Sequence, residues 1–178
     1  GLRLIAAECP ELLVGFSASK SFGLYRDRVG AVLAQCAGPE TQTQMQGLLT
    51  WLNRQNYAFP PDHGARVVQV ILDDPDLRAM WETELTTMRT EINANRQGFA
   101  DALRAHQMGR LADQIAAQRG MFSLLGLSVE QVRRLRENCA IYLVEDSRAN
   151  LAAMTPMSSR IVAQAIFPPE RGDSLSGF

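Results

Sequence analysis

Hydrophobic residues recur every three or four positions over a long stretch in the middle of the chain. They are Leu77, Trp81, Leu85, Met88, Ile92, Phe99 and Leu103. This period is typical of an amphipathic α-helix, and Asp74-Pro75 provides a capping side chain followed by a proline suited to the first helical turn. The pattern therefore predicts a long helix over residues 76–104. A coiled coil is the alternative, but the hydrophobic stripe drifts and lacks sustained heptads.

Shorter patterns flank this helix on both sides. On the N-terminal side we expect the end of a helix at 2–8, strands at 12–16 and 29–37, and helices at 41–55 and 65–72. On the C-terminal side we expect strands at 121–127, 140–145 and 148–154 and helices at 129–138 and 156–166. Ser128 with Gln131 forms a capping-box pattern, and Thr155-Pro156 is a second helix start. The tail from Pro168, rich in Pro, Gly and Ser, is predicted to be disordered.

The composition narrows the class of protein. With 178 residues and 46% hydrophobic content, the chain is long enough for one or two domains with a sizeable core. A net charge of −1 without a basic stripe argues against nucleic acid and anionic membranes, and no apolar run approaches the ~20 residues that cross a bilayer. The three cysteines are widely spaced, which fits reduced thiols in a cytoplasm. The two histidines lie far apart, so a metal site has little support.

Candidate chemistry centres on Lys20, the only lysine among 18 basic residues. A lysine amine can lose its proton and form a Schiff base with a carbonyl, which arginine cannot do. Lys20 lies where a predicted strand gives way to a loop, and Ser17 and Arg28 on either side are suited to bind a phosphate. These three side chains together match the needs of pyridoxal phosphate. The alternative is a surface lysine left by a bias toward arginine.

The segment SASKSFGLYRDRVG closely resembles the pyridoxal-phosphate lysine motif of the aspartate/aromatic aminotransferase family, commonly SxSKNFGLYxERVG. The resemblance continues in FPPDHGARVV, GMFSLLGL and DSRANLAAMT, in the family's order. It implies an α/β fold, the C-terminal part of a fold-type-I aminotransferase. The implied domains are the end of the large cofactor-binding domain at 1–75, a connecting helix at 76–104, a small domain at 105–168 and a disordered tail at 169–178. The family's first half, which carries several cofactor contacts, would lie upstream.

The resemblance also assigns roles to single residues. Lys20 would be the catalytic Schiff-base lysine, and Ser17 and Arg28 would bind the cofactor phosphate. Arg148 lies in a stretch similar to the family's SGRxNxAGMT, where the arginine grips the substrate α-carboxylate. Asp146-Ser147 replaces the usual Ser-Gly and places an extra acid beside this site. The alternatives are an ion pair of Arg28 with Asp27 or Glu40, a buried serine bonded to backbone, and an ion pair of Arg148 with Glu145 or Asp146.

Two further residues complete the predicted site. Arg54 occupies the place of a second substrate arginine that reaches into the partner subunit's site, and the alternative is a helix-surface arginine. Phe122 matches an aromatic that lines the substrate pocket, and core packing is its alternative. Ala58 replaces a serine that in relatives touches the partner's cofactor phosphate. Tyr25 and Trp81 are assigned to packing.

Taken together, the resemblance implies a homodimeric, cytoplasmic, pyridoxal-phosphate-dependent transaminase. It would exchange an amino group between aspartate or aromatic L-amino acids and 2-oxoglutarate. The small-molecule partners would be amino acids and 2-oxo acids. One alternative is another pyridoxal-phosphate reaction on the same scaffold. Another is a non-catalytic module that dimerises or binds a partner. The isolated fragment is expected to bind the cofactor weakly, to be inactive and to expose an apolar face.

Overall fold

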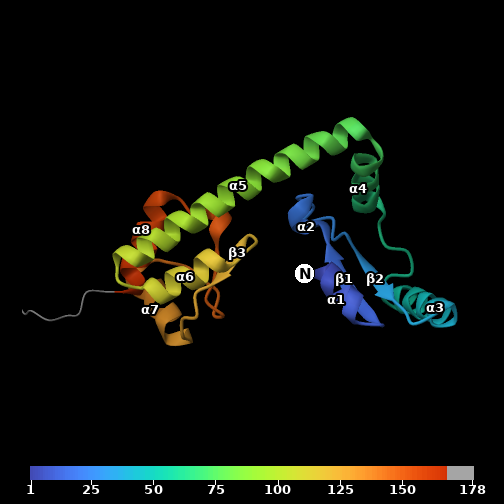
Figure 1. Ribbon diagram of the computed structural model, residues 1–178, viewed down its shortest axis with the longest axis horizontal. Helices are drawn as coiled ribbons and strands as arrows, with labels where there is room; N and C mark the ends of the chain where they lie inside the picture. Colours follow the sequence, from blue (N-terminus) through green and yellow to red (C-terminus); the bar gives the residue numbers. More distant parts are fainter. Residues whose placement is uncertain (168–178) are drawn as a thin grey trace, which may run out of the picture. The chain divides into compact units, whose positions relative to one another are not determined.

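The computed structural model describes residues 1–167, which form two compact units (Figure 1). Unit 1 comprises Gly1–Leu85, and unit 2 begins at Thr86. Helix α5 (Pro75–Ala105) starts in unit 1 and continues into unit 2. The predicted disordered tail at 169–178 lies outside the described residues. The assignment of large domain, connecting helix and small domain stays a prediction.

Unit 1 is built on a β-hairpin. Helix α1 (Leu2–Glu8) precedes strand β1 (Leu12–Ser17), the one-turn helix α2 (Ala18–Ser21) and strand β2 (Gly30–Gln35). The strands pair antiparallel from Leu12 opposite Gln35 to Ser17 opposite Gly30. A side chain at Gly30 would place its Cβ 2.2 Å from the carbonyl oxygen of Phe16, so only glycine allows this close pairing.

Two helices follow the hairpin in unit 1, α3 (Pro39–Asn56) and α4 (His63–Asp73). The second of these lies against the loop that leads into β2. A Cβ at Gly64 would come within 2.9 Å of the Asp27 Cβ and 3.0 Å of the Val29 Cβ. The absence of a side chain at Gly64 therefore lets α4 approach the segment that carries Arg28.

Helix α5 confirms the predicted long helix and extends over 31 residues. The side chain of Asp74 caps it, because its Oδ1 accepts hydrogen bonds from the backbone N–H groups of Asp76 (2.9 Å) and Leu77 (3.1 Å). The hydrophobic stripe is buried only toward its C-terminal end, where Phe99 and Leu103 are fully enclosed.

Unit 2 forms around that buried end of α5. Its elements are α6 (Gly109–Ala117), β3 (Phe122–Leu124), α7 (Val129–Cys139), β4 (Arg148–Asn150), the 3₁₀ turn η1 (Leu151–Ala153) and α8 (Pro156–Ile166). Strands β3 and β4 pair antiparallel, with Leu124 opposite Arg148. The core contains Phe99, Ala100, Leu103, Ala112, Ile115, Leu125, Ala149, Leu151, Val162 and Ala163. The two predicted helix starts are confirmed, since α7 and α8 both begin with complete capping boxes.

The predicted strand at 140–145 is wrong. Ile141 and Leu143 pack against the core while Tyr142 and Val144 are exposed, so the alternating pattern reflects burial without strand pairing. The backbone N–H of Ile141 bonds instead to the Leu135 carbonyl of α7, and the Leu143 carbonyl accepts from Arg136. Because these backbone groups of Ile141 and Leu143 are bonded to residues of α7, they are not available for pairing with another strand.

The strands predicted at 121–127 and 148–154 are shorter than expected, at three residues each. The second ends because the side chain of Asn150 accepts a hydrogen bond from the N–H of Ala152 at 3.0 Å. This local bond competes with strand pairing and starts the η1 turn.

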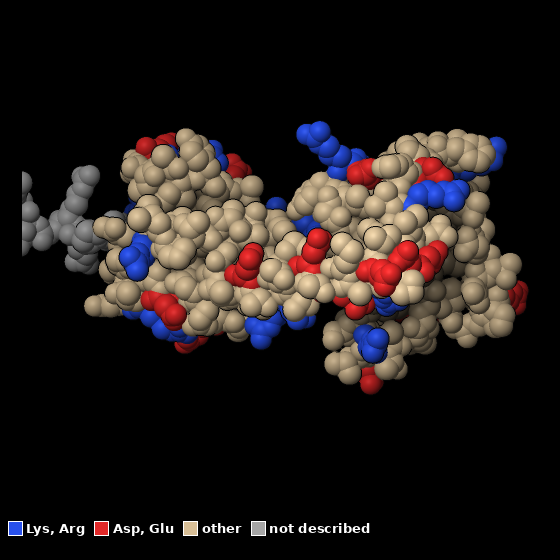
Figure 2. All heavy atoms as spheres, turned by 90° about the horizontal axis from the view of Figure 1, so that it is seen from above, with Lys and Arg blue, Asp and Glu red and all other residues tan. Residues whose placement is uncertain are grey.

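The described surface has few features that select a class of partner. Acidic and basic side chains interleave on the face seen in Figure 2, in keeping with the net charge of −1. None of the helices formed by residues 1–167 combines the length and the hydrophobicity of a membrane span. The three cysteines, Cys9, Cys36 and Cys139, are free thiols.

Candidate active site

The hairpin of unit 1 positions the predicted cofactor-binding residues. Strand β1 ends at Ser17, and α2 begins at once, so Lys20 lies on a helical turn and not in the loop expected from the sequence. The Ser17 hydroxyl caps this turn by accepting the N–H of Ser19 at 3.3 Å and donates to the Ser19 hydroxyl at 3.0 Å. The N–H of Ala18 donates to the Val29 carbonyl at 3.0 Å. The turn is thus fixed to the end of β1 and to the residue that precedes β2.

The amine of Lys20 lies over an aromatic ring. Its Nζ is 3.8 Å from the ring centroid of Tyr25, a cation–π contact, and both side chains are exposed. The sequence assigned Tyr25 to packing and did not indicate this contact. The contact places the phenol directly beside the only lysine side chain of the protein.

Arg28 lies at the same end of the hairpin as Ser17 and Lys20, because Ser17 pairs with Gly30 two residues further on. Its Nη1 donates to the Tyr25 carbonyl at 3.3 Å, and its backbone has a positive φ of 51°. Among the described residues, Arg28 forms no ion pair with Asp27 or Glu40, the two partners weighed as alternatives. Three exposed side chains with the chemistry to bind an aldehyde and a phosphate therefore lie at the same end of the hairpin.

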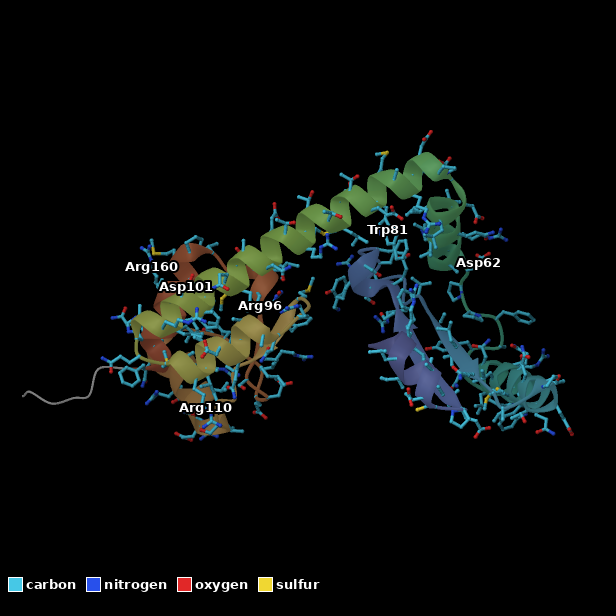
Figure 3. The ribbon with its side chains drawn as sticks, in the orientation of Figure 1. Asp62, Trp81, Arg96, Asp101, Arg110 and Arg160 are labelled. Carbon is cyan, nitrogen blue, oxygen red and sulfur yellow. The ribbon has the colours of Figure 1, made fainter. Side chains whose placement is uncertain are left out.

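Trp81 anchors the turn that carries Lys20. Its indole Nε1 donates to the Ser21 carbonyl at 2.8 Å, and its ring stacks on Phe22 with centroids 4.5 Å apart and planes 10° from parallel. Figure 3 shows the Trp81 side chain extending from α5 toward the end of α2. The packing role expected for Trp81 therefore has a definite target, which no local sequence signal could have identified.

Arg148 and Phe122 come together in unit 2. The guanidinium carbon of Arg148 lies 5.2 Å from the Phe122 ring centroid, because β4 pairs with β3. Arg148 also has an acidic neighbour, since its Nε lies 3.8 Å from Oδ2 of Asp146. The ion pair with Asp146, one of the alternatives for Arg148, is thus present, while the guanidinium stays about half exposed.

A buried arginine supports the turn that leads into β3. Arg96 of α5 donates through Nη2 to the Gly120 carbonyl and through Nη1 to Asn93 Oδ1 at 3.0 Å. Its burial lowers the pKa of its guanidinium from the ordinary value, and the nearby charge of Arg119 lowers it further. Arg96 therefore positions the strand that carries Phe122, a role that the sequence did not suggest.

Arg54 lies in the last turn of α3, away from an acidic partner among the described residues. Its guanidinium carbon is 6.0 Å from the Phe59 ring centroid, and its side chain is exposed. Ala58, which follows the helix, has a positive φ of 59°. This exposed position fits both interpretations of Arg54, a residue directed at another subunit and a surface arginine.

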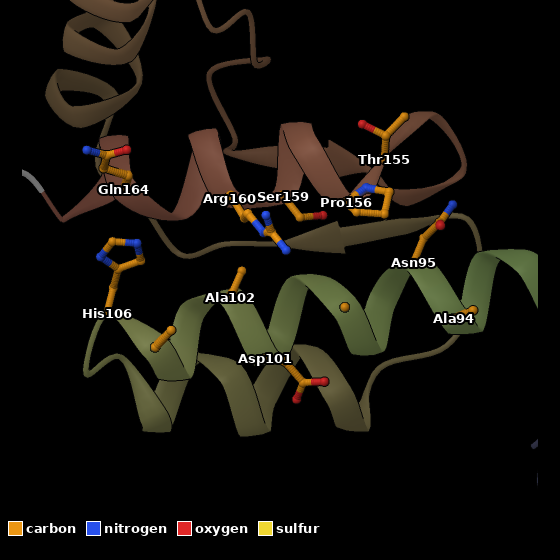
Figure 4. Close-up of a pocket in the computed structure, with 12 residues that line it drawn as sticks. Ala94, Asn95, Asp101, Ala102, His106, Thr155, Pro156, Ser159, Arg160 and Gln164 are labelled. Atoms are coloured by element: carbon orange, nitrogen blue, oxygen red, sulfur yellow. The ribbon is translucent and has the colours of Figure 1, made fainter.

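The predicted site residues divide between the two units. Ser17, Lys20, Arg28 and Arg54 belong to unit 1, whereas Phe122 and Arg148 belong to unit 2. A hollow of about 740 Å³ lies elsewhere in unit 2, between α5 and α8, where Arg160 and Ala102 face one another (Figure 4). None of the residues that line this hollow is a predicted site residue. Within residues 1–167, no group of three or more His, Cys, Asp or Glu side chains is placed to hold a metal ion.

Comparison with known proteins adds independent information. The profile of the family described as aminotransferase class I and II matches residues 1–166. The aromatic-amino-acid aminotransferase of Paracoccus denitrificans is 45% identical over 93% of this chain, and so is the aspartate aminotransferase of Escherichia coli K12. The chain spans 42% of the length of each of these relatives.

Solved structures agree with the sequence relatives. A structure of an aromatic amino acid aminotransferase with 3-indolebutyric acid superposes with a TM-score of 0.85 at 44% identity, covering 93% of this chain and 42% of that one. The aromatic-amino-acid aminotransferase of Burkholderia pseudomallei, covalently bound to pyridoxal phosphate, gives 0.80 at 41% identity, covering 93% and 41%.

Proposed function

We propose that this chain, which belongs to the aminotransferase class I and II family, is part of a pyridoxal-phosphate-dependent aminotransferase. The complete enzyme would exchange an amino group between aspartate or an aromatic L-amino acid and a 2-oxo acid such as 2-oxoglutarate. The observation that carries the proposal is the location of Ser17, Lys20 and Arg28 at the same end of the β1–β2 hairpin. The relatives named as aromatic-amino-acid and aspartate aminotransferases support the substrate class.

The side chains of unit 1 fit the cofactor. When bound, pyridoxal phosphate supplies an aldehyde for the amino group and a ring that draws electrons from the substrate. The amine of Lys20 would hold that aldehyde, and the hydroxyl of Ser17 and the guanidinium of Arg28 would bind the phosphate. Once the substrate amine has displaced it, the amine of Lys20 would take the proton from the substrate Cα and deliver it to the cofactor carbon that had carried the aldehyde.

The side chains of unit 2 would hold the substrate. Arg148 offers a planar guanidinium to the α-carboxylate, and a two-pronged bond would orient the Cα–H bond for removal of its proton. Phe122 lies beneath that guanidinium and would provide an apolar wall next to the bound amino acid. Positioning of this kind lowers the entropic part of the reaction barrier.

The proposal extends to a homodimer and to the two-domain plan. Arg54 is exposed on α3, so in the complete enzyme it would reach the site of a second subunit and pair with the side-chain carboxylate of a dicarboxylic substrate. Unit 1 would belong to the large cofactor-binding domain and most of unit 2 to the small domain. The free thiols of the three cysteines support a cytoplasmic location.

Labelling with the cofactor tests the central residue. Adding pyridoxal phosphate to the 178-residue chain and reducing with borohydride should attach the cofactor to Lys20, as read by peptide mass spectrometry. The amino terminus is the other primary amine in this chain and serves as an internal control. Arg28→Gln should weaken the labelling of Lys20 without changing that of the terminus. Equal labelling of both amines, unaffected by Arg28→Gln, would contradict the proposed cofactor site.

A second candidate function rests on the apolar surface of unit 1. Leu13, Val32 and Leu33 of the hairpin are more than half exposed. Leu13 and Val32 lie on one face of the hairpin and Leu33 on the other, and a non-catalytic module that associates through the first face would bury Leu13 and Val32. A module needs the apolar surface, whereas cofactor labelling of Lys20 does not. Val32→Asp should therefore abolish self-association of a module, as measured by sedimentation, and leave the labelling of Lys20 unchanged.

A further inference from the structure

The guanidinium of Arg148 is already next to a carboxylate of its own chain. Oδ2 of Asp146 lies 3.8 Å from Arg148 Nε, and Oδ1 accepts the backbone N–H of Arg148 at 3.0 Å. The bond to the backbone N–H fixes the position of this carboxylate next to the Arg148 side chain, so that only the arginine side chain has to be ordered to form the ion pair.

The position of Asp146 selects one edge of the guanidinium. An arginine can receive a carboxylate along its Nε side or across its two terminal nitrogens. Asp146 lies at Nε, and the Phe122 ring lies near the guanidinium carbon. Among residues 1–167, neither terminal nitrogen of Arg148 has a hydrogen-bond partner. The terminal edge is therefore the one that remains for an incoming carboxylate.

We propose that Asp146 is an internal competitor for Arg148, which weakens the binding of a substrate carboxylate and directs it to the two terminal nitrogens. The inference rests on the proposed function, in which Arg148 binds that carboxylate. Asp146-Ser147 stands where the common pattern of the family that this stretch resembles has Ser-Gly, so that pattern lacks the carboxylate. An aspartate there adds a negative charge beside a residue whose role is to attract one.

The size of the effect follows from the exposure of the pair. Asp146 and Arg148 are each about half exposed, and solvent screens an ion pair in such a place. A pair of this kind changes an equilibrium by up to about five-fold. Removing the charge of Asp146 should therefore tighten carboxylate binding by about two- to five-fold, from both the loss of the internal pair and the loss of repulsion.

The test uses Asp146→Asn in the full 178-residue chain. Asparagine keeps the side-chain oxygen that accepts the Arg148 N–H and removes only the charge. The probe is benzoate, a monocarboxylate with a flat apolar face suited to Phe122, and its Kd is measured by NMR from the Arg148 side-chain Nε signal and the backbone amides of β4. Benzamide, an uncharged analogue, reports effects that do not involve charge.

Glu145→Gln is the matched control. It removes the same charge one residue away, and among the described residues Glu145 forms no ion pair. We expect Asp146→Asn to bind benzoate two- to five-fold more tightly, with Glu145→Gln and benzamide binding unchanged. Weaker or unchanged benzoate binding in Asp146→Asn, or an equal gain in Glu145→Gln, would overturn the role of Asp146.

Arg148→Ala separates this inference from the function on which it rests. If Arg148→Ala leaves benzoate binding unchanged, Arg148 does not bind carboxylates, and the proposed substrate role fails. If Arg148→Ala abolishes binding while Asp146→Asn has no effect, the substrate role stands and the internal competitor is rejected.

Discussion

The two units of the protein hold their functional residues in different ways. Unit 2 has a closed hydrophobic core, and Arg148 lies on a strand whose next residue, Ala149, is part of that core. In the described part of unit 1, Ala18 is the buried hydrophobic residue, and the hairpin exposes Leu13 and Val32. The lysine turn is held by strand pairing, a tryptophan contact and close glycine contacts. In this chain, backbone contacts therefore position the lysine turn, whereas Arg148 is positioned by a strand that belongs to the core of unit 2.

The largest test of this comparison uses two phenylalanines. Phe99 is fully buried in unit 2 and Phe16 is about half exposed in unit 1. Phe99→Ala should destabilise unit 2 by about 3–5 kcal/mol, because it removes buried apolar surface and leaves a cavity. Phe16→Ala should cost less than about 1 kcal/mol. Urea unfolding of both variants measures the difference, and equal costs would show that unit 1 has a core of its own.

The second test concerns the backbone contacts of unit 1. Gly30→Ala places a Cβ against the Phe16 carbonyl, so the strands must separate, at a cost of about 1–3 kcal/mol. Gly15→Ala is the control, because nothing lies within 4 Å of its Cβ position. Amide hydrogen exchange across β1 and β2 should accelerate in the first variant only. Slow exchange in Gly30→Ala would show that the hairpin adapts and that glycine is not required.

The third test concerns the anchor of the lysine turn. Trp81→Phe keeps a ring to stack on Phe22 but loses the hydrogen bond to the Ser21 carbonyl, which is worth about 1 kcal/mol. Exchange of the α2 amides should become faster by a few fold. Trp51→Phe changes an exposed tryptophan and should leave them unaltered. If both variants behave alike, Trp81 does not hold the turn.

The smallest effect is expected at an exposed ion pair of unit 1. The hydrogen bond from Arg66, 3.0 Å from Nε to Oδ2, holds the pKa of Asp62 below its ordinary value. A depressed carboxyl pKa contributes stability above the ordinary pKa, and this stability is lost as the pH falls through the lowered value. NMR shifts of α4 should therefore show slight fraying at acid pH, and Asp62→Asn should lack this pH response. An identical pH response in both proteins would show that the Asp62–Arg66 pair does not stabilise α4.

The helices could be predicted because their capping residues and hydrophobic period are visible in the local sequence. The caps at Asp74, Ser128 and Thr155 marked three helix starts correctly. Strands were harder to predict. The alternation at 140–145 reflects which side chains are buried and does not indicate a pairing partner. The need for a partner distant in sequence is what the local pattern lacks.

In the candidate site, too, local motifs could be predicted and contacts between distant residues could not. Sequence motifs identified Lys20 and Arg148, and their roles stay predictions until labelling and binding are measured. The contacts that position them were missed: Tyr25 under the lysine amine, Trp81 on the lysine turn and Arg96 behind the strand of Phe122. Two of these three join residues more than twenty positions apart, which a motif cannot encode.

Ser147 meets two opposing structural requirements. Its φ of 61° favours glycine, yet its buried hydroxyl accepts the N–H of Leu127 at 3.2 Å. Replacement by glycine would relax the backbone and leave that N–H without its acceptor, whereas alanine would keep the backbone cost and lose the acceptor as well. Ser147 therefore couples the residue before β4 to the segment that precedes α7, and each replacement would weaken that link in a different way.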